Sequence, residues 1–316
     1  MPVLQPIEVS AESKWATIFA VVIAVPQLTD LAFIDIGNHA QALALAARTF
    51  DIPSYIIMPS ISTPSKIEAT KSYGATVIFS GPTSQEREAV AKRVIDETGP
   101  IFVSSADHPD IILGQGTVGL ELEQQVRELV STNPTSSLHG ATGDRDPDSM
   151  SSRAGTLDAV ITPIGCGGLN SGVATLFASR PQTLIFGAEP SFEGGDDCRR
   201  GLAAGHRITV VQTLTIADGL RQPVGEIPWT IISDDRKVRG VYAVTEEHIR
   251  SAMKLVLEKV GILAEPSAVV GLAVVLYNEE FRRMVEREAP EGWDIGIVFS
   301  GGNTTPETIL KLYEGG

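Results

Sequence analysis

The sequence contains few cysteines, few basic residues and no apolar run long enough to cross a bilayer. Its 316 residues include two cysteines, Cys166 and Cys198, which excludes a disulfide framework and favours a reducing, cytoplasmic location. Lys and Arg number 25 against 39 Asp and Glu, for a formal charge of −14. This balance argues against nucleic acid and an anionic membrane as partners. The remaining composition is that of a soluble globular chain of about two domains that binds a small molecule.

An apolar stretch near the N-terminus, residues 15–25 (WATIFAVVIAV), ends before Pro26. A membrane-spanning helix needs about 20 such residues, so this stretch is too short. A signal peptide would carry a basic region before the stretch, whereas Glu8 and Glu12 precede it together with the single Lys14. The stretch is predicted to be a buried helix or strand, with a targeting segment as the alternative.

From residue 31 onward, short β-branched runs alternate with Ala- and Leu-rich stretches of helical length. Strands are predicted at 54–59, 76–80, 101–105, 158–165, 183–189 and 294–301. Helices are predicted at 39–50, 64–73, 84–98, 115–130, 169–178, 246–260 and 266–281. Thr83 and Glu86 form a capping-box pattern, and Gly261 stands where a helix ends. Because the strands are apolar throughout, they predict parallel sheets with helices on both faces, an α/β fold.

Residues 131–157 interrupt this alternation with Ser, Thr, Gly, Asp and Pro and offer almost nothing to bury. The sequence on both sides of this segment is of the same α/β kind. The segment is therefore predicted to be a solvated surface insertion, and a domain boundary is the alternative.

A glycine-rich turn, Gly165 to Gly172 (GCGGLNSG), follows a predicted strand and opens a predicted helix. Glycines at such a turn let backbone N–H groups converge on an anion at the helix N-terminus. Neither nucleotide fingerprint fits, because Asn170 stands where a dinucleotide motif needs glycine and no G-K-[ST] follows. The turn is predicted to bind a single phosphate group, unless it is only a tight turn.

Two further stretches carry groups suited to a small ligand. The segment 37–47 opens a helix with Gly37, and the amide of Asn38 is able to donate to a phenolate or carboxylate. A simple capping role for Asn38 is the alternative, and His39 is predicted to cap or pack. Ser300 lies at the carboxyl end of a predicted strand, where open α/β sheets bind ligands, and it offers a neutral hydroxyl.

Carboxylates gather in the segment 187–198 (GAEPSFEGGDDC). Glu189 ends a predicted strand, and Asp196 and Asp197 follow in a glycine-rich loop. Hard oxygen ligands of this kind suit Mg²⁺ or Ca²⁺. In a chain this acidic, a solvated surface loop is the alternative.

Eight segments of the chain occur in the order and approximate spacing of one enzyme family. They are residues 37–47, 64–81, 114–126, 165–168, 188–202, 215–226 (TIADGLRQPVGE), 264–273 (AEPSAVVGLA) and 299–303 (FSGGN). In these segments the chain resembles the serine/threonine dehydratase and serine racemase family, pyridoxal-phosphate enzymes of fold type II with a tryptophan-synthase-β-like fold. The resemblance covers about residues 36–130 and 156–310.

The resemblance implies two open parallel-sheet domains and a homodimer. The large, cofactor-binding domain would comprise residues 1–30 and 112–316, with the polar insertion at 131–157. The small, mobile domain would comprise residues 31–111 and would close over the large one to exclude water.

The resemblance also implies roles for individual residues. Pyridoxal 5'-phosphate would be held by Gly165, Cys166, Gly167, Gly168, Asn38, Glu265 and Ser300. The substrate carboxylate would be held around Gly37, Asn38 and His39, and Mg²⁺ in metal-dependent members by Glu189, Gly195 and Asp197. A hydroxyl such as that of Ser300 beside the pyridine nitrogen does not enforce a protonated ring, which favours β-elimination.

The lysine that forms the Schiff base in this family lies in an S-F-K-x-R-G-A context upstream of the segment that begins at Gly37. This chain has no such string, and Lys14 is its only lysine before Asn38. Lys14 is therefore either a diverged Schiff-base and catalytic lysine, or the lysine segment is missing from this sequence.

The residue before Gly37 bears on the type of reaction. The racemases need a protic residue there, commonly serine, to reprotonate Cα. This chain has Ile36, whose alkyl side chain donates no proton. The expected activity is therefore an ammonia-lyase (dehydratase) acting on L-serine, L-threonine or a related β-hydroxy amino acid. Serine racemase activity and a non-catalytic relative that lacks the lysine remain alternatives.

Overall fold

The computed structural model describes residues 31–34, 38–62, 64–81, 84–132, 157–290 and 292–314. These residues form two compact units, one ending at Gln115 and one beginning at Gly116, and each is described by itself. The apolar stretch 15–25, Lys14, Thr83 and nearly all of the polar insertion lie outside the described residues. The prediction that residues 1–30 join the large domain therefore stays a prediction. No helix of the described ranges is both long and apolar enough to cross a membrane.

The unit that ends at Gln115 contains a four-stranded parallel sheet in the order β3-β2-β1-β4. Its strands are β1 (Leu31–Ile34), β2 (Ser54–Pro59), β3 (Thr76–Ser80) and β4 (Ile101–Val103), and its helices include α2 (Asn38–Thr49), α3 (Pro64–Ser72) and α4 (Ser84–Thr98). Ala40, Leu43, Ala44 and Ala47 of α2 share one helix face and are buried in its core. Because three of these side chains are single methyl groups, α2 packs closely on the sheet.

The unit that begins at Gly116 contains a second parallel sheet, in the order β7-β6-β5-β8. Its strands are β5 (Ala159–Pro163), β6 (Leu184–Pro190), β7 (Gly240–Val244) and β8 (Ile295–Ile297). Its helices are α7 (Gly168–Phe177), α8 (Asp197–Ala204), α9 (Glu226–Ile232), α10 (Glu246–Val260), α11 (Val270–Tyr277), α12 (Glu279–Glu288) and α13 (Pro306–Glu314), with most of α5 (Pro109–Thr132).

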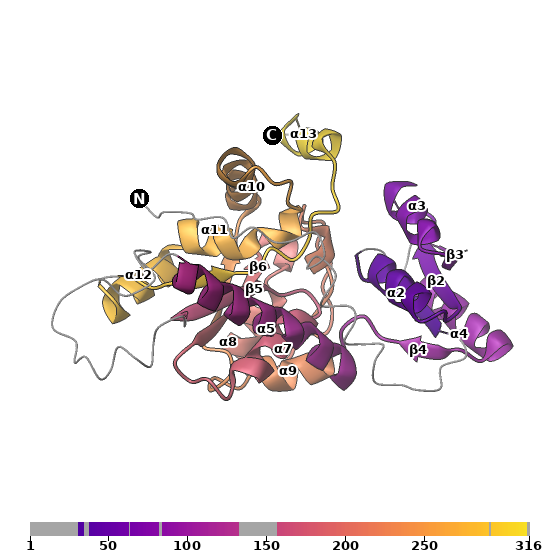
Figure 1. Cartoon of the computed structure of the whole chain (residues 1–316), viewed down its shortest axis with the longest axis horizontal. Coiled ribbons are helices and arrows are strands. Elements are labelled where there is room, and N and C mark those ends of the chain that lie inside the picture. The colour runs from indigo at the N-terminus through magenta and orange to yellow at the C-terminus, as the bar shows by residue number, and fades with distance from the viewer. Residues whose placement is uncertain are drawn as a thin grey trace. The chain divides into compact units, whose positions relative to one another are not determined.

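Helices cover both faces of this second sheet (Figure 1). Ile161 of β5 belongs to a core shared with α10 and α11, whereas its neighbour Val160 belongs to a core shared with α7. Successive side chains of a strand point to opposite faces, so a strand covered on both sides must be apolar throughout. The predicted α/β class with parallel sheets is therefore confirmed.

Most predicted elements are present, but some boundaries and several elements differ. The strands predicted at 54–59 and 76–80 match β2 and β3, and Gly261 ends α10 with φ +74° and its N–H directed at Val256 O and Leu257 O. The strands β1 and β7 and the helices α8, α9, α12 and α13 were not predicted. The single helix predicted at 266–281 was wrong, because it is broken before α11 and again at Asn278. The Asn278 side chain accepts the N–H of Phe281 and starts α12.

Candidate functional site

The candidate site lies at the carboxyl edge of the second sheet. Strands β5, β6 and β8 run parallel and adjacent, so the segments that follow them emerge at one edge. Gly165–Gly168, called the glycine loop below, follows β5, and Ser300 follows β8. Residues 189–197, called the acidic loop below, end β6 and lead into α8. Open α/β sheets bind ligands at this edge.

The glycine loop needs its glycines for two different reasons. Gly167 is the N-cap of α7 and has φ +88°, a left-handed conformation that L side chains rarely adopt. A Cβ atom there would also lie 2.9 Å from Pro228 Cβ and 2.9 Å from Ile232 Cδ1. At Gly165, which has an ordinary φ, a Cβ atom would lie 2.9 Å from Gly219 O. The loop backbone is therefore packed too closely for any other residue at these two positions.

The N-terminus of α7 fits a phosphate group. Its N-cap, Gly167, has no side chain and so makes no side-chain capping hydrogen bond. The first N–H groups of a helix carry a partial positive charge and bind phosphate well. The Cys166 thiol points to Gln222, donating to Oε1 at 2.8 Å, so the loop offers backbone groups to a ligand at this position. A phosphate-bearing cofactor is therefore compatible with the residues present.

Asn170 fixes α7 against the sheet. Its side chain is fully buried, and its amide nitrogen donates to Thr162 Oγ1 on β5 at 2.8 Å and to Phe186 O on β6 at 3.0 Å. In the sequence, Asn170 is notable only as a departure from a nucleotide-binding motif, and no structural role was predicted for it. A buried amide in the first turn of the helix is the signal that could have identified it as an anchor.

A chain of contacts joins the glycine loop to two other predicted motifs. Gly219, which packs against Gly165, donates its N–H to Ser267 Oγ at 3.0 Å. Two residues before Ser267, the N–H of Glu265 donates to Gly301 O at 3.0 Å. The buried Glu265 carboxylate accepts the N–H of Asn303 at 2.7 Å. These contacts hold the segments that carry Glu265 and Ser300 in fixed relation to the glycine loop, which the sequence alone did not show.

The remaining predicted cofactor and substrate residues lie in several places. Ser300 is exposed, so its hydroxyl is accessible to a ligand. Asn38 and His39 begin α2 in the other unit, with Asn38 exposed and His39 half-buried. Gly37, like Lys14, lies outside the described residues. The roles of all these residues stay predictions.

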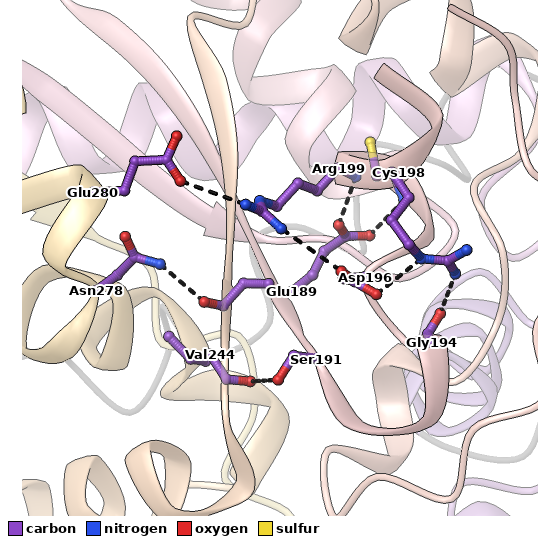
Figure 2. A network of polar contacts seen from close by, with 11 residues as sticks. Glu189, Ser191, Gly194, Asp196, Cys198, Arg199, Val244, Asn278 and Glu280 are labelled. Carbon is purple, nitrogen blue, oxygen red and sulfur yellow. Dashed lines mark hydrogen bonds and ion pairs between the residues drawn. The ribbon is translucent and has the colours of Figure 1, made fainter. Parts of the chain in front are cut away.

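Glu189, at the end of β6, is directed at the N-terminus of α8 (Figure 2). It is 1% exposed, and its two carboxylate oxygens accept the backbone N–H groups of Cys198 at 3.0 Å and Arg199 at 2.9 Å. Burial and the nearby Asp197 carboxylate raise the pKa of Glu189 well above its ordinary value. Glu189 therefore supplies the acceptors that the start of α8 lacks.

The two aspartates of the acidic loop have different surroundings. Asp197 is buried and accepts the N–H of Val224 at 3.1 Å, and burial raises its pKa to about 6. Asp196 faces two guanidinium groups, with Arg200 Nε 3.0 Å from one carboxylate oxygen and Arg199 Nη1 3.9 Å from the other. Arg200 Nη2 also donates to Gly194 O at 2.7 Å.

The acidic loop is connected to α12 through Arg199. The guanidinium of this residue lies 3.5 Å from a carboxylate oxygen of Glu280, so it bridges Glu280 and Asp196 (Figure 2). Across the described ranges, no group of three or more His, Cys, Asp or Glu side chains is arranged to hold a metal ion. Neither arginine was predicted to belong to the site, although their positions three and four residues after Asp196 are the usual signal for ion pairs within a helix.

Comparison with known proteins gives consistent matches. The family model described as "Pyridoxal-phosphate dependent enzyme" matches residues 34–301. Serine racemase from Oryza sativa subsp. indica is 38% identical over 268 residues, which cover 84% of this chain and 69% of that protein. L-threo-3-hydroxyaspartate ammonia-lyase from Pseudomonas sp is 31% identical over 282 residues, covering 88% of this chain and 76% of that protein.

The fold agrees with a solved structure as well. The structure of maize serine racemase superposes with a TM-score of 0.79 at 34% sequence identity, covering 96% of this chain and 83% of that chain. The glycine loop, the acidic loop and Ser300 all fall within the residues matched by the family model.

Proposed function

Because the chain belongs to the pyridoxal-phosphate dependent enzymes, we propose that it is an ammonia-lyase acting on a small β-hydroxy amino acid. L-serine or L-threonine would yield a 2-oxo acid and ammonia. The observation that carries this proposal is the glycine loop at the start of α7, which contacts join to the segments of Glu265 and Ser300. Similarity to an enzyme named as an ammonia-lyase supports the reaction class.

The residues that would hold the cofactor lie mainly at the carboxyl edge of the second sheet. The backbone N–H groups of Gly165–Gly168 would hold the phosphate, and the Ser300 hydroxyl would meet the pyridine nitrogen. Glu265 would lie beside the ring edge, kept in place by the N–H of Asn303. When bound, pyridoxal phosphate withdraws electrons from the substrate Cα and so makes its proton acidic.

The substrate would be held by residues of the segment 37–47, near the start of α2. The Asn38 amide would donate to the ring oxygen of the cofactor, and backbone groups around Gly37 and His39 would bind the substrate carboxylate. Lys14 would hold the cofactor aldehyde and take the proton from Cα. The uncommon surroundings of Lys14 make it the residue whose role most needs a direct test.

The first experiment asks whether the chain holds the cofactor through a lysine. Purified protein with added pyridoxal phosphate is examined by visible absorption, then treated with borohydride, which makes a lysine–cofactor bond permanent, and mapped by peptides. Labelling of Lys14 would support the proposal. Absence of any labelled lysine would instead favour the alternative of a non-catalytic relative, in keeping with the missing S-F-K-x-R-G-A string.

The second experiment separates the lyase from the racemase alternative. Similarity to proteins named serine racemase favours racemisation, whereas Ile36 before Gly37 favours elimination because it donates no proton. We expect pyruvate from L-serine or 2-oxobutanoate from L-threonine in a coupled assay, with little D-serine by chiral chromatography. Formation of D-serine faster than pyruvate would show that racemisation, and not elimination, is the main activity.

The setting of the enzyme is also a proposal. A cytoplasmic location is supported by the presence of only two cysteines, and a homodimer by the resemblance to the family. Size-exclusion chromatography with light scattering tests the dimer. The proposed reaction uses no step on Mg²⁺. The Glu189 and Asp197 carboxylates, which were predicted to bind it together with Gly195, accept backbone N–H groups.

A further inference from the structure

The carboxylates of the acidic loop are occupied by hydrogen bonds from the chain itself. Both oxygens of Glu189 accept N–H groups at the start of α8, and one oxygen of Asp197 accepts the N–H of Val224. A helix N-terminus carries roughly half a positive charge, which repels a metal ion. Calcium and magnesium need six or more oxygen ligands, most of them turned toward the ion. The donors of this loop are turned toward the protein.

Positive charge is already present in the loop. Arg200 places Nε 3.0 Å from Asp196 Oδ1 and Nη2 2.7 Å from Gly194 O, so one guanidinium binds a carboxylate and a backbone carbonyl together. Those are the two kinds of oxygen that a divalent ion would take. The charge of Arg200 also lowers the pKa of Asp197 against the effect of burial.

The backbone of the loop leaves space for this guanidinium. Gly194 has φ +79°, and a Cβ atom there would lie 3.1 Å from Arg200 Nη2. Positive charge beside the carboxylates of the loop comes from the two arginines that face Asp196 and from the helix N-terminus that faces Glu189.

We propose that Arg200, bound to Asp196 and Gly194 O beside the residues predicted to bind Mg²⁺, is the built-in cation of the acidic loop, and that the chain is stable without divalent metal ions. Arg199 extends the same arrangement to Glu280 at the start of α12. The loop and the two helices are thus held together by side chains alone.

The test is thermal unfolding of the full chain with chelator, with millimolar Mg²⁺ and with millimolar Ca²⁺, together with calorimetric titration of Ca²⁺. We expect one unfolding temperature for the unmodified protein in all three solutions and no heat of binding. In Arg200→Gln, Asp196 and Gly194 O lose their cation, so the unfolding temperature falls and Ca²⁺ restores about 2–4 °C.

Arg283→Gln is the matched control, because Arg283, like Arg200, pairs with a carboxylate four residues earlier. Its partner is Glu279, at 2.6 Å on an exposed helix face. We expect no response to metal ions in that variant. Arg200→Lys keeps the charge but loses the paired donors. Its unfolding temperature and its response to Ca²⁺ should lie between those of the unmodified protein and those of Arg200→Gln. Submillimolar Ca²⁺ or Mg²⁺ binding that stabilises the unmodified protein would overturn the proposal. An Arg200→Gln variant that ignores Ca²⁺ would overturn it as well.

Discussion

Helices α7 and α8 begin at the same edge of one sheet, after the neighbouring strands β5 and β6, yet their N-termini are satisfied in opposite ways. The N-cap of α7 is Gly167, which has no side chain that could accept an N–H of the first turn. The start of α8 receives both carboxylate oxygens of the buried Glu189. A helix end that the protein leaves without a side-chain acceptor suits an external anion, whereas one filled from within serves stability.

The largest effect is expected from placing a side chain at the N-cap of α7. Gly167→Ala combines a left-handed backbone with contacts of 2.9 Å to Pro228 and Ile232. We expect the free energy of unfolding to fall by about 2–4 kcal/mol and cofactor affinity to fall at least about tenfold. Urea unfolding and titration with pyridoxal phosphate measure these two quantities.

Gly205→Ala is the matched control for this change. Gly205 also has a positive φ, +73°, but nothing lies within 4 Å of a Cβ atom there. The free energy of unfolding of Gly205→Ala should fall by only about 1 kcal/mol, and its cofactor affinity should equal that of the unmodified protein. Equal losses of cofactor affinity in the two variants would show that backbone strain, and not the position at α7, causes the effect.

The second-largest effect is expected from removing the carboxylate at the start of α8. Glu189→Ala leaves the N–H groups of Cys198 and Arg199 without their acceptor, so the free energy of unfolding should fall by about 2–4 kcal/mol. Glu193→Ala, which removes an exposed carboxylate that accepts one N–H from Leu214, should cost less than about 1 kcal/mol. Urea unfolding of both variants measures the difference. Similar losses of unfolding free energy in the two variants would contradict the role of Glu189 at the start of α8.

A third helix end gives an intermediate case. Thr245 caps α10 with its hydroxyl, which accepts the N–H of His248 at 3.2 Å. Thr245→Ala should cost about 1 kcal/mol in urea unfolding, without a change in cofactor affinity. Thr230→Ala, which removes an exposed hydroxyl bonded within α9, should cost less than about 0.5 kcal/mol. A loss of cofactor affinity in Thr245→Ala would contradict the distinction between helix ends that bind ligand and those that do not.

The smallest effect tests the α7 end with an anion alone. Inorganic phosphate at a concentration equal to its Kd should stabilise the cofactor-free protein by about 0.4 kcal/mol. Thermal unfolding measures this, and chloride at equal ionic strength is the control. Gly167→Ala should lose the response and Glu189→Ala should keep it. The reverse pattern would place the anion at α8.

The family and the fold class were predicted from the sequence and confirmed, because both depend on local patterns. Apolar runs such as 54–59 fix a strand, and the glycines at 165–168 mark a turn into a helix. The missed strand β7 is five residues long and follows a polar segment, so its pattern is weak. Helix α8 was missed because its sequence contains glycine, aspartate and two arginines, and its start depends on a carboxylate in β6.

The sequence located the glycine loop, whose role in binding a cofactor stays a prediction, but it did not indicate contacts between residues that are distant in the chain. Acidic residues at 189, 196 and 197 suggested a metal site from their chemistry. Their hydrogen-bond partners include Val224, which lies 27 residues beyond Asp197, and no local pattern reports such a contact. The role of Ser267 depends likewise on Gly219, 48 residues earlier.

The position of β8 has a consequence for how the chain acquires its structure during synthesis. This strand completes the second sheet beside β5, and the contact between Asp158 and Asp294 at its start joins residues 136 positions apart. The first sheet is complete once β4 has been synthesised. In the second sheet, the edge of β5 that pairs with β8 stays unpaired until nearly the whole chain has been synthesised. We expect ribosome-bound chains that stop before β8 to be cut by protease within the second unit and protected within the first, since unpaired strand edges in incomplete parallel sheets are exposed during folding.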